Sequence, residues 1–580
     1  MHVARIKSSH VDKFGQRREY QSVYLRTSYR EGGKVKHEQV ANLSPLPAAA
    51  IEAIEAVLAG QILVAAGSGS GLDIVRSLPH GHVAAVWAMA GKLGLGNLLG
   101  PACRERDLAL ALIISRVVAP RTKLATARWW SDSTLGTDLG VSEASTDEVY
   151  AAMDWLLVRQ DSIEATLAAR HLAPAPNPSR MALFDLSSSW MTGRCCPLAK
   201  RGYSRDGKKG LPQIEYGLLT DPAGRPVAVR VFDGNTADPS AFITAVDIVR
   251  EKFGLTEMVM VGDRGMITAA RIEAVKQLGG MGWLTCLRNP AIAKLAADDG
   301  PLQMTLFDQA NLAEIAHPDY PGERLIACRN PLLATERARK RGELLAATDT
   351  LLAPVLAAVA DGRLAGADAI GLKVGRLIDK YKMAKHFDLA ITDTTLAVTR
   401  KQTQIDAEAA LDGIYVIRTN VPTNRLDPTA AVLAYKNLAH VERNFRIMKA
   451  DDLDLRPIHH HLQDRVRAHV LICTLAAYLV WHLRKAWAPL TYTDETPPTR
   501  TDPVTPARRS PAAHRKAAHK TATTDPHTPL HSFRGLLEHL ATLTRNHTRI
   551  GDTEFDQLTT PTPTQRQAFG SAPGLVDTRG

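Results

Sequence analysis

The sequence predicts an α/β fold in which a sheet presents carboxylates at the ends of its strands. Residues 181–186 and 258–263 are short apolar runs, and each contains an isolated aspartate at or near its end, Asp185 and Asp263. A hairpin pattern follows the first run and a helix pattern follows the second. Strand and helix patterns that alternate in this way are typical of α/β proteins.

An N-terminal β unit is expected over residues 1–75. Residues 20–29 and 34–40 are rich in strand formers, and a Gly-Gly turn between them predicts a hairpin. Its Lys and Arg side chains could touch phosphate, although a solvated hairpin face is the commoner explanation.

A helical domain is expected over residues 76–175. Ala- and Leu-rich patterns recur at 83–93, 108–118 and 146–157. The spacing shows no clear helix-turn-helix, so a role in binding nucleic acid rests on position alone. The Pro-rich segment 174–178 reads as a linker.

Residues 176–300 are expected to form the first part of the catalytic core. The runs that end near Asp185 and Asp263 read as buried strands, and residues 214–232 read as a hairpin with a turn at 221–224. Helices are predicted at 240–253, after an Asp-Pro start, and at 268–278. Such strands and helices, with acids at strand ends, are the ribonuclease-H-like arrangement. The sequence does not fix the strand order.

The interval between Asp263 and Glu442 is far too long for a loop inside a compact core. We therefore expect an insertion domain over 301–410 and the second part of the core over 411–489. A helix pattern at 429–449 would place Glu442 on the same side as Tyr435 and Leu438.

The last segment, residues 490–580, is rich in Thr, Pro and Arg. It buries too little apolar area to offset its ordering entropy, so we expect a disordered tail with one possible short helix at 532–543.

Composition favours a soluble protein with a polyanionic partner. The 71 Lys and Arg exceed the 60 Asp and Glu, which gives a formal charge of +11. The six cysteines are scattered and match neither a disulfide framework nor a zinc site. The N-terminus shows no signal peptide, and the apolar run 470–481 is too short to cross a bilayer, so it reads as a buried helix. We expect a reduced, cytoplasmic protein that uses no membrane.

Asp185, Asp263 and Glu442 together suggest a two-metal phosphoryl-transfer site. Two divalent ions about 3.5–4 Å apart can activate an attacking oxygen and neutralise a leaving oxygen, and hard cations prefer carboxylate ligands. Each acid also has an ordinary explanation. The two aspartates could be turn residues, and Glu442 could lie on a solvated helix face.

At this point the sequence resembles a known family, the DDE-type bacterial insertion-sequence transposases of the IS-four-like group. The group carries a Tyr-x2-Arg-x3-Glu-x6-Lys signature, and Tyr435, Glu442 and Lys449 stand at its spacings while Leu438 replaces the Arg. Blocks around Asp185, Asp263 and residues 412–420 add to a resemblance that covers about residues 180–485.

The resemblance implies that Asp185, Asp263 and Glu442 bind Mg2+, with Mn2+ as a substitute. It also implies that Tyr435 and Lys449 contact phosphates of the transposon end, with Arg443 or Arg446 in place of the missing Arg. The implied function is cut-and-paste DNA transposition, in which the helical domain 76–175, from its position alone, could bind DNA ends. The implied partners are double-stranded DNA, as terminal inverted repeats and target, and further copies in a homodimer or larger synaptic complex. A metal-dependent nuclease of the same fold and a non-catalytic DNA-binding derivative are the alternatives.

Three further features have two explanations each. The histidines 459–461 and His469 suggest zinc, but no cysteine accompanies them, so a helix-start or DNA-facing cluster is favoured. Trp283 could stack on bases, although a core tryptophan is more common. The basic loop 205–210 either meets the DNA backbone or is a solvated turn.

Overall fold

The computed structural model describes residues 1–11, 13, 17–61, 72–173, 180–193, 195–297, 300–493, 495, 502–505, 514, 517–518, 530–550 and 553–571. These fall into two compact units, Met1–Ser77 with Arg545–Thr559 and Leu78–Thr544 with Thr560–Gly580. The expected linker at 174–178 lies outside the described residues, as does most of 496–529.

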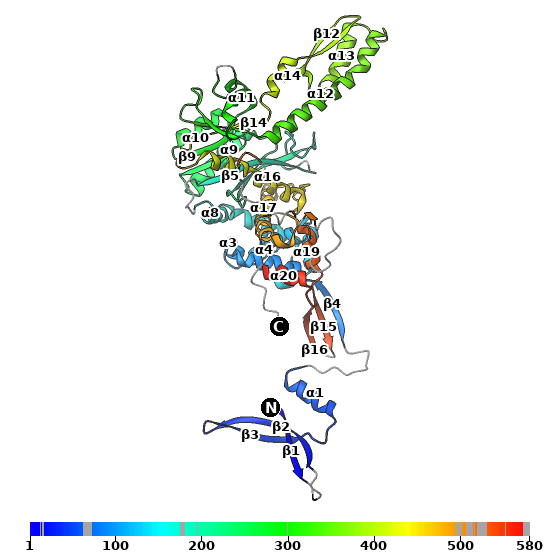
Figure 1. Ribbon diagram of the computed structural model, residues 1–580. Helices are drawn as coiled ribbons and strands as arrows, with labels where there is room; N and C mark the ends of the chain where they lie inside the picture. The colour runs from blue at the N-terminus through cyan, green and yellow to red at the C-terminus, as the bar shows by residue number, and fades with distance from the viewer. Residues whose placement is uncertain are drawn as a thin grey trace. The chain divides into compact units, whose positions relative to one another are not determined.

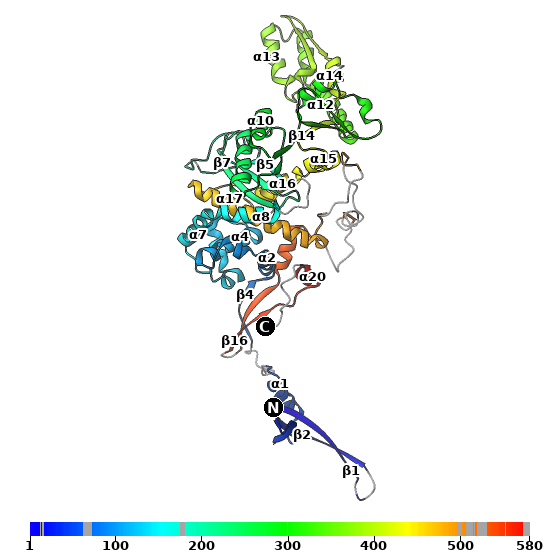
Figure 2. The ribbon, with the colours of Figure 1, turned by 90° about the vertical axis from the view of Figure 1, so that its left-hand side faces the viewer.

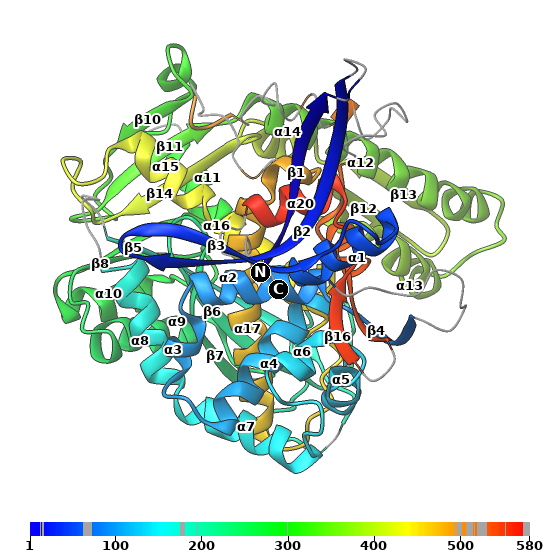
Figure 3. The ribbon, with the colours of Figure 1, turned by 90° about the horizontal axis from the view of Figure 1, so that it is seen from below.

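The first unit begins with a three-stranded antiparallel meander. Strands β1 (His2–Val11), β2 (Arg17–Glu31) and β3 (Lys34–Asn42) pair in that order, and helix α1 (Ala48–Leu58) follows (Figure 3). Val23, Leu43 and Ile51 form its small core. A second sheet joins β4 (Asp73–Pro79), β15 (Thr544–Ile550) and β16 (Thr553–Leu558) in the order β16-β15-β4. The pairing of β4 with β15 brings distant parts of the sequence into one sheet.

The second unit is built on one eight-stranded sheet of order β10-β11-β14-β9-β8-β5-β6-β7. Strands β5, β8 and β9 are parallel, and the other neighbours are antiparallel. The five strands β5 to β9 lie in the chain order 3-2-1-4-5, an order that the sequence does not fix. The strands are β5 (Met181–Trp190), β6 (Gln213–Thr220), β7 (Pro226–Asp233), β8 (Met258–Val261), β9 (Met281–Cys286), β10 (Leu312–Ile315), β11 (Arg324–Arg329) and β14 (Ile414–Thr419).

Helices α9 and α10 connect the strands of the core. The helix expected at 240–253 begins at Asp238 and passes into a π-helical turn, and the helix expected at 268–278 is found at nearly the same place. Their bounds, with two short helices that follow β9, are α9 (Asp238–Asp247), η1 (Ile248–Lys252), α10 (Ala269–Leu278), α11 (Asn289–Leu295) and η2 (Met304–Phe307).

The helices before the sheet do not form a separate domain. They share one continuous hydrophobic core with the sheet, and the unit boundary lies near residue 78 rather than at 175. The long helix α17 (Gln463–Ala486) makes this possible, because it packs against α2, α4, α7 and β7 at once (Figures 1 and 2). The helices of this block are α2 (Gly81–Lys92), α3 (Leu95–Leu99), α4 (Arg104–Val118), α5 (Lys123–Trp130), α6 (Thr134–Asp138), α7 (Thr146–Val158) and α8 (Gln160–His171).

The insertion is smaller than the expected 301–410. Strands β10 and β11 belong to the main sheet, because β11 pairs with β14 from Arg324↔Thr419 to Arg329↔Ile414. The segment with a core of its own starts at Pro331 and includes Leu352, Val374 and Phe387. Its elements are α12 (Pro331–Ala360), α13 (Ala367–Ile378), η3 (Ala384–His386), β12 (Phe387–Ile391), β13 (Leu396–Arg400) and α14 (Gln402–Ala409).

Helices α12 and α17 are both long and apolar enough to cross a membrane by length and composition alone. The apolar part of α17 is mostly buried inside the unit, as its sequence predicts, and α12 packs on α13. Both therefore have partners within the protein.

The expected disordered tail contains folded elements. Helix α19 (Phe533–Ala541) buries Phe533, Leu536 and Leu540, and it packs on α2. Helix α20 (Pro563–Ser571) accompanies it, and β15 and β16 lie between them in the sequence. The apolar residues of this segment are spaced to cover one helix face, which a composition dominated by Thr and Pro obscures.

Candidate active site

Asp185 lies on the central strand β5 and is half-buried. Its Oδ1 accepts a hydrogen bond of 2.8 Å from the Leu186 backbone N–H. Strand β5 has neighbours on both sides, β6 and β8, so the Asp185 backbone is held firmly within the sheet.

Asp263 follows the parallel neighbour of that strand. Leu183 of β5 pairs with Val261 of β8, and the two aspartates each stand two residues beyond this pair. Strand β8 ends at Val261, whereas β5 continues past Asp185 to Trp190, so Asp185 lies within its strand rather than at its end as the sequence predicts. The parallel register still brings the two carboxylates to the same level of the sheet. Asp263 is exposed, and its Oδ1 accepts a hydrogen bond of 3.4 Å from the Tyr435 hydroxyl.

Glu442 approaches the two aspartates from a helix. Residues 429–449 are divided into α15 (Pro428–Lys436), α16 (Leu438–Arg446) and the π-helical turn η4 (Ile447–Asp451), rather than one continuous helix. Tyr435 thus belongs to α15 and Glu442 to α16. Helix α16 packs against β5 (Figures 1 and 2). Its exposed residue Glu442 lies near enough to Asp185 to influence its charge.

The turn between β6 and β7 holds α16 in place. The Asn444 side-chain amide donates to the Gly224 carbonyl at 2.7 Å. Gly224 has a φ of +83°, and a Cβ there would lie 2.6 Å from the His440 Cβ of the same helix. Only glycine both adopts this conformation easily and leaves room for the helix. The turn therefore fixes the position from which Glu442 projects.

The three acids influence one another electrostatically. Burial raises the pKa of Asp185 to about 7, and the charges of Asp263 and Glu442 add to this rise, while the Leu186 N–H and Arg205 oppose it. Three carboxylates that repel one another form a donor set suited to a hard divalent cation, whose charge would relieve the repulsion. Among the described residues, no three His, Cys, Asp or Glu side chains are gathered closely enough to hold one ion as they stand. The donor chemistry fits the metal, and the side chains would have to converge on it.

Comparison with known proteins identifies the family. The sequence profile of the transposase DDE domain matches residues 187–479, which is half of the chain. The chain belongs to the DDE transposase family. Members of this family cut and join DNA, and the transposase therefore catalyses DNA cleavage and strand transfer. The match begins two residues after Asp185 and includes Asp263 and Glu442.

The N-terminal segment has a match of its own. Residues 11–67 match the N-terminal domain of IS1634 family transposases. Among curated proteins, none matches the transposase. Among solved structures, it resembles the piggyBac transposase synaptic complex with hairpin DNA, at a TM-score of 0.30 and 8% identity over 79% of this chain and 76% of that chain.

The sequence did not predict a network of charged residues near the triad, in which Glu215 is buried and Arg205 is partly exposed. Arg205 donates to Asp238 at 2.6 Å and forms an ion pair with Glu215 at 3.3 Å, and its backbone N–H donates to the Ser188 hydroxyl. Burial raises the pKa of Glu215 to about 7. A charged residue inside the apolar run 214–219 was the available signal for this network.

Two predicted DNA contacts have protein partners in the structure. Lys449 is buried, and its Nζ donates to the Asp206 carboxylate at 2.8 Å. The π-helical turn carries Lys449 out of the register with Glu442 that a continuous α-helix would give. Arg443 binds both oxygens of Glu495, at 2.9 and 2.6 Å.

The other signature positions differ in their exposure to solvent. Tyr435 is half-buried beside Asp263, Arg446 is exposed, and Leu438 is buried in the core. Leu438 takes the place of the signature Arg, and it is buried. A phosphate contact at this position would require an exposed cation, so this position makes none. Arg446 is thus the predicted DNA contact most open to solvent.

The other ambiguous features are now placed. Trp283 is a buried core residue of β9, so the explanation as a core tryptophan applies rather than base stacking. His469 is buried and bonded to Lys123 and Leu455, and His459 to Thr192, so these histidines are engaged in protein contacts. The loop 205–210 is tethered at Arg205 and Asp206 but exposes Lys208 and Lys209.

Proposed function

We propose that Asp185, Asp263 and Glu442 are the catalytic acids of this transposase and bind Mg2+, with Mn2+ as a substitute. The observation that carries the proposal is the matched position of the two aspartates beyond the Leu183–Val261 pair, with Glu442 close enough to raise the pKa of Asp185. The bound ions would activate the attacking oxygen and neutralise the leaving oxygen of a phosphodiester.

The surrounding residues orient the acids. The Tyr435 hydroxyl holds Asp263, the Gly224 turn holds the helix of Glu442, and the Leu186 N–H holds Asp185. Hydrogen bonds to carboxylates of this kind fix their direction before a metal binds. Arg205 adds a positive charge near Asp185 and is itself held by Asp238 and Glu215.

We further propose that the transposase belongs to the IS-four-like group. Tyr435, Glu442 and Lys449 at the signature spacings support this, and Leu438 is the departure from it. Lys449 would contact phosphate only by leaving Asp206, so Arg446 is the better candidate for that contact. The substrate would be terminal inverted repeats and target DNA, processed in the cytoplasm by a homodimer or larger synaptic complex.

Substitution of each acid tests the proposal. Asp185→Asn, Asp263→Asn and Glu442→Gln should each abolish cleavage of DNA that carries the transposon ends while DNA binding persists. Near-normal cleavage by any one of them would remove that residue from the catalytic set.

A further inference from the structure

A second site lies in a cavity of about 520 Å³ between the N-terminal helices and the catalytic part of the same unit. We call it the basic pocket. Its charged and histidine lining residues are Arg116, Arg121, Lys123, Asp454, Arg456, His459, His460 and His469. Four of these residues are arginines or lysines, and only one, Asp454, is an acid.

Two of these cations are buried without a carboxylate. Arg116 and Lys123 are each 5% exposed. Arg116 donates to the carbonyls of Leu453 and Arg121 at 3.3 and 2.9 Å. These are neutral acceptors, and among the described residues neither cation forms an ion pair with an acid. Buried charges in proteins are normally paired, so this pair lacks its counter-charge.

The partner of Lys123 is a neutral histidine. His469 Nε2 contacts the Leu455 carbonyl at 3.1 Å, so this nitrogen carries the hydrogen. Burial holds the pKa of His469 well below its usual range, so its Nδ1 has a free lone pair and accepts from the Lys123 Nζ at 3.2 Å. Burial and the neighbouring Arg116 charge also hold the pKa of Lys123 well below its usual range. Lys123 thus keeps hydrogen-bonding capacity for another acceptor, and an anion in the pocket would stabilise its charged form.

Two of the other charged residues around the pocket already have partners, and Arg121 lies at the exposed rim. Arg456 pairs with Asp206, and Asp454 lies 3.9 Å from Arg534. Neither acid is therefore the counter-charge of Arg116 or Lys123.

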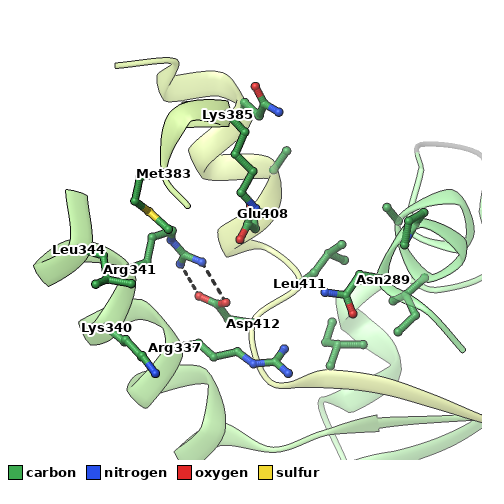
Figure 4. Close-up of a pocket in the computed structure, with 16 residues that line it drawn as sticks. Asn289, Arg337, Lys340, Arg341, Leu344, Met383, Lys385, Glu408, Leu411 and Asp412 are labelled. Carbon is green, nitrogen blue, oxygen red and sulfur yellow. Dashed lines mark hydrogen bonds and ion pairs between the residues drawn. The ribbon is translucent and has the colours of Figure 1, made fainter. Parts of the chain in front are cut away.

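The larger cavity at the base of the insertion provides a contrast. It measures about 690 Å³, and its partly buried cation Arg341 has a carboxylate partner, Asp412 (Figure 4). Lys385 of the same cavity pairs with Glu408. The basic pocket differs because its two most buried cations have no acid.

Helix α5 adds to the positive potential. It starts at Lys123, with Thr122 as its N-cap, and both residues line the pocket. A helix N-terminus carries a partial positive charge and favours phosphate groups. The N-terminus of α5 therefore adds positive potential to that of the two buried cations, Arg116 and Lys123.

We propose that the basic pocket binds a phosphate group of the DNA backbone. The inference rests on the transposase function, which supplies DNA as the polyanion. The pocket is joined to the active-site region by the loop 205–210, because Asp206 pairs with Arg456 of the pocket while Arg205 lies near Asp185. A strand held in the pocket would thus be fixed by the same loop that flanks the catalytic acids.

Salt-dependent binding tests this site without any need for catalysis. The full chain is titrated with a labelled DNA duplex of mixed sequence, in chelator, at several salt concentrations. Lys123→Met, which keeps the length of the side chain, should weaken binding about tenfold and lower the slope of log affinity against log salt by about one. Lys92→Met is the matched control, because Lys92 is exposed on the same block of helices and does not line the pocket, and it should leave both unchanged.

Thermal unfolding distinguishes a ligand site from a structural role. Without DNA, Lys123→Met should melt at the same or a higher temperature than the wild type, because it removes a buried amine whose charged form has no counter-charge. Lower DNA affinity combined with undiminished stability would support the proposal. A folded Lys123→Met protein with unchanged affinity and slope would overturn it.

Two further arms keep the test decisive. If Lys123→Met does not fold, Arg121→Gln at the exposed rim should still lower the salt slope, and an unchanged slope would overturn the proposal. If inorganic pyrophosphate stabilises the wild type but Lys123→Met binds DNA normally, the pocket takes a small phosphate compound and the DNA assignment is wrong. Because chelator is present throughout, a fault in the catalytic proposal would not alter any of these results.

Discussion

Asp185 of β5 and Asp263, which follows the end of β8, stand in equivalent positions, each two residues beyond the register pair Leu183–Val261. This relationship needs no metal to maintain it, because the ladder between β5 and β8 sets it. The strands place the two acids before any ion binds, and helix α16 adds Glu442.

Loss of any one acid should stop the chemistry. We expect Asp185→Asn, Asp263→Asn and Glu442→Gln to lower the cleavage rate by about 100-fold or more, because each removes a metal ligand. Gel-based cleavage of transposon-end DNA measures the rate, and a binding assay checks that affinity is kept. Asp388→Asn in the insertion is the control, since Asp388 is exposed and away from the triad.

The metal-free protein should become less stable as pH rises through the range below about 7. The pKa of Asp185 is raised in the folded state to about 7, above its ordinary value of 3.8, so the folded protein holds this proton more tightly than the unfolded chain does. The loss of stability therefore develops between about pH 4 and pH 7 and levels off above that.

Comparison with Asp185→Asn isolates this contribution, because Glu215 titrates in the same range. Melting temperatures in chelator across this pH range should fall less steeply for the variant than for the wild type. Parallel curves for the two proteins would show that Asp185 titrates normally.

Lys449 should act through Asp206 rather than through DNA. Its Nζ contacts the buried Asp206 carboxylate, so Lys449→Met leaves that carboxylate with Arg456 as its remaining partner and should cost about 2–4 kcal/mol of stability. Chemical denaturation measures the free energy of unfolding. A double variant with Asp206→Asn should lose less than the sum of the two single losses.

The salt dependence of DNA binding separates Lys449 from Arg446. Arg446→Ala should lower the slope of log affinity against log salt by about one, while Lys449→Met leaves it unchanged. A lower slope for Lys449→Met would contradict this prediction and would support the phosphate contact that the signature implies.

The C-terminal segment should be needed for folding. A chain that ends at Pro489 lacks Glu495, which binds Arg443, and helix α19, which covers part of α2. We expect this chain to be insoluble or to melt well below the full chain. Leu536→Ala tests the same contact more gently, with an expected loss of about 2–5 kcal/mol, and a chain that ends at Ser571 is the control.

Local patterns predict the centre of the fold well. The runs at 181–186 and 258–263 are strands because apolar residues buried on both sides of a sheet need no alternation. The helix at 268–278 ends at Gly279, whose φ of +65° suits a helix terminus. Such signals lie within a few residues of each other and depend little on the rest of the chain.

Features that depend on distant partners escape such patterns. The apolar face of α17 indicates burial, but not that α4 and α7 would cover it and merge the helical block with the sheet. Strands β10 and β11 are short, and they join the core only because β11 pairs with β14 and β10 pairs with β11. The ion pair of Lys449 needs both the π-helical turn and the loop of Asp206, which no spacing rule anticipates.

Titration with Mn2+ followed by electron paramagnetic resonance tests the shared metal site most directly. The wild type should bind Mn2+, and Asp185→Asn, Asp263→Asn and Glu442→Gln should each bind it at least about tenfold more weakly, whereas Asp388→Asn should bind as the wild type does. Equal Mn2+ binding by the wild type and all three variants would contradict the claim that these acids form one metal site.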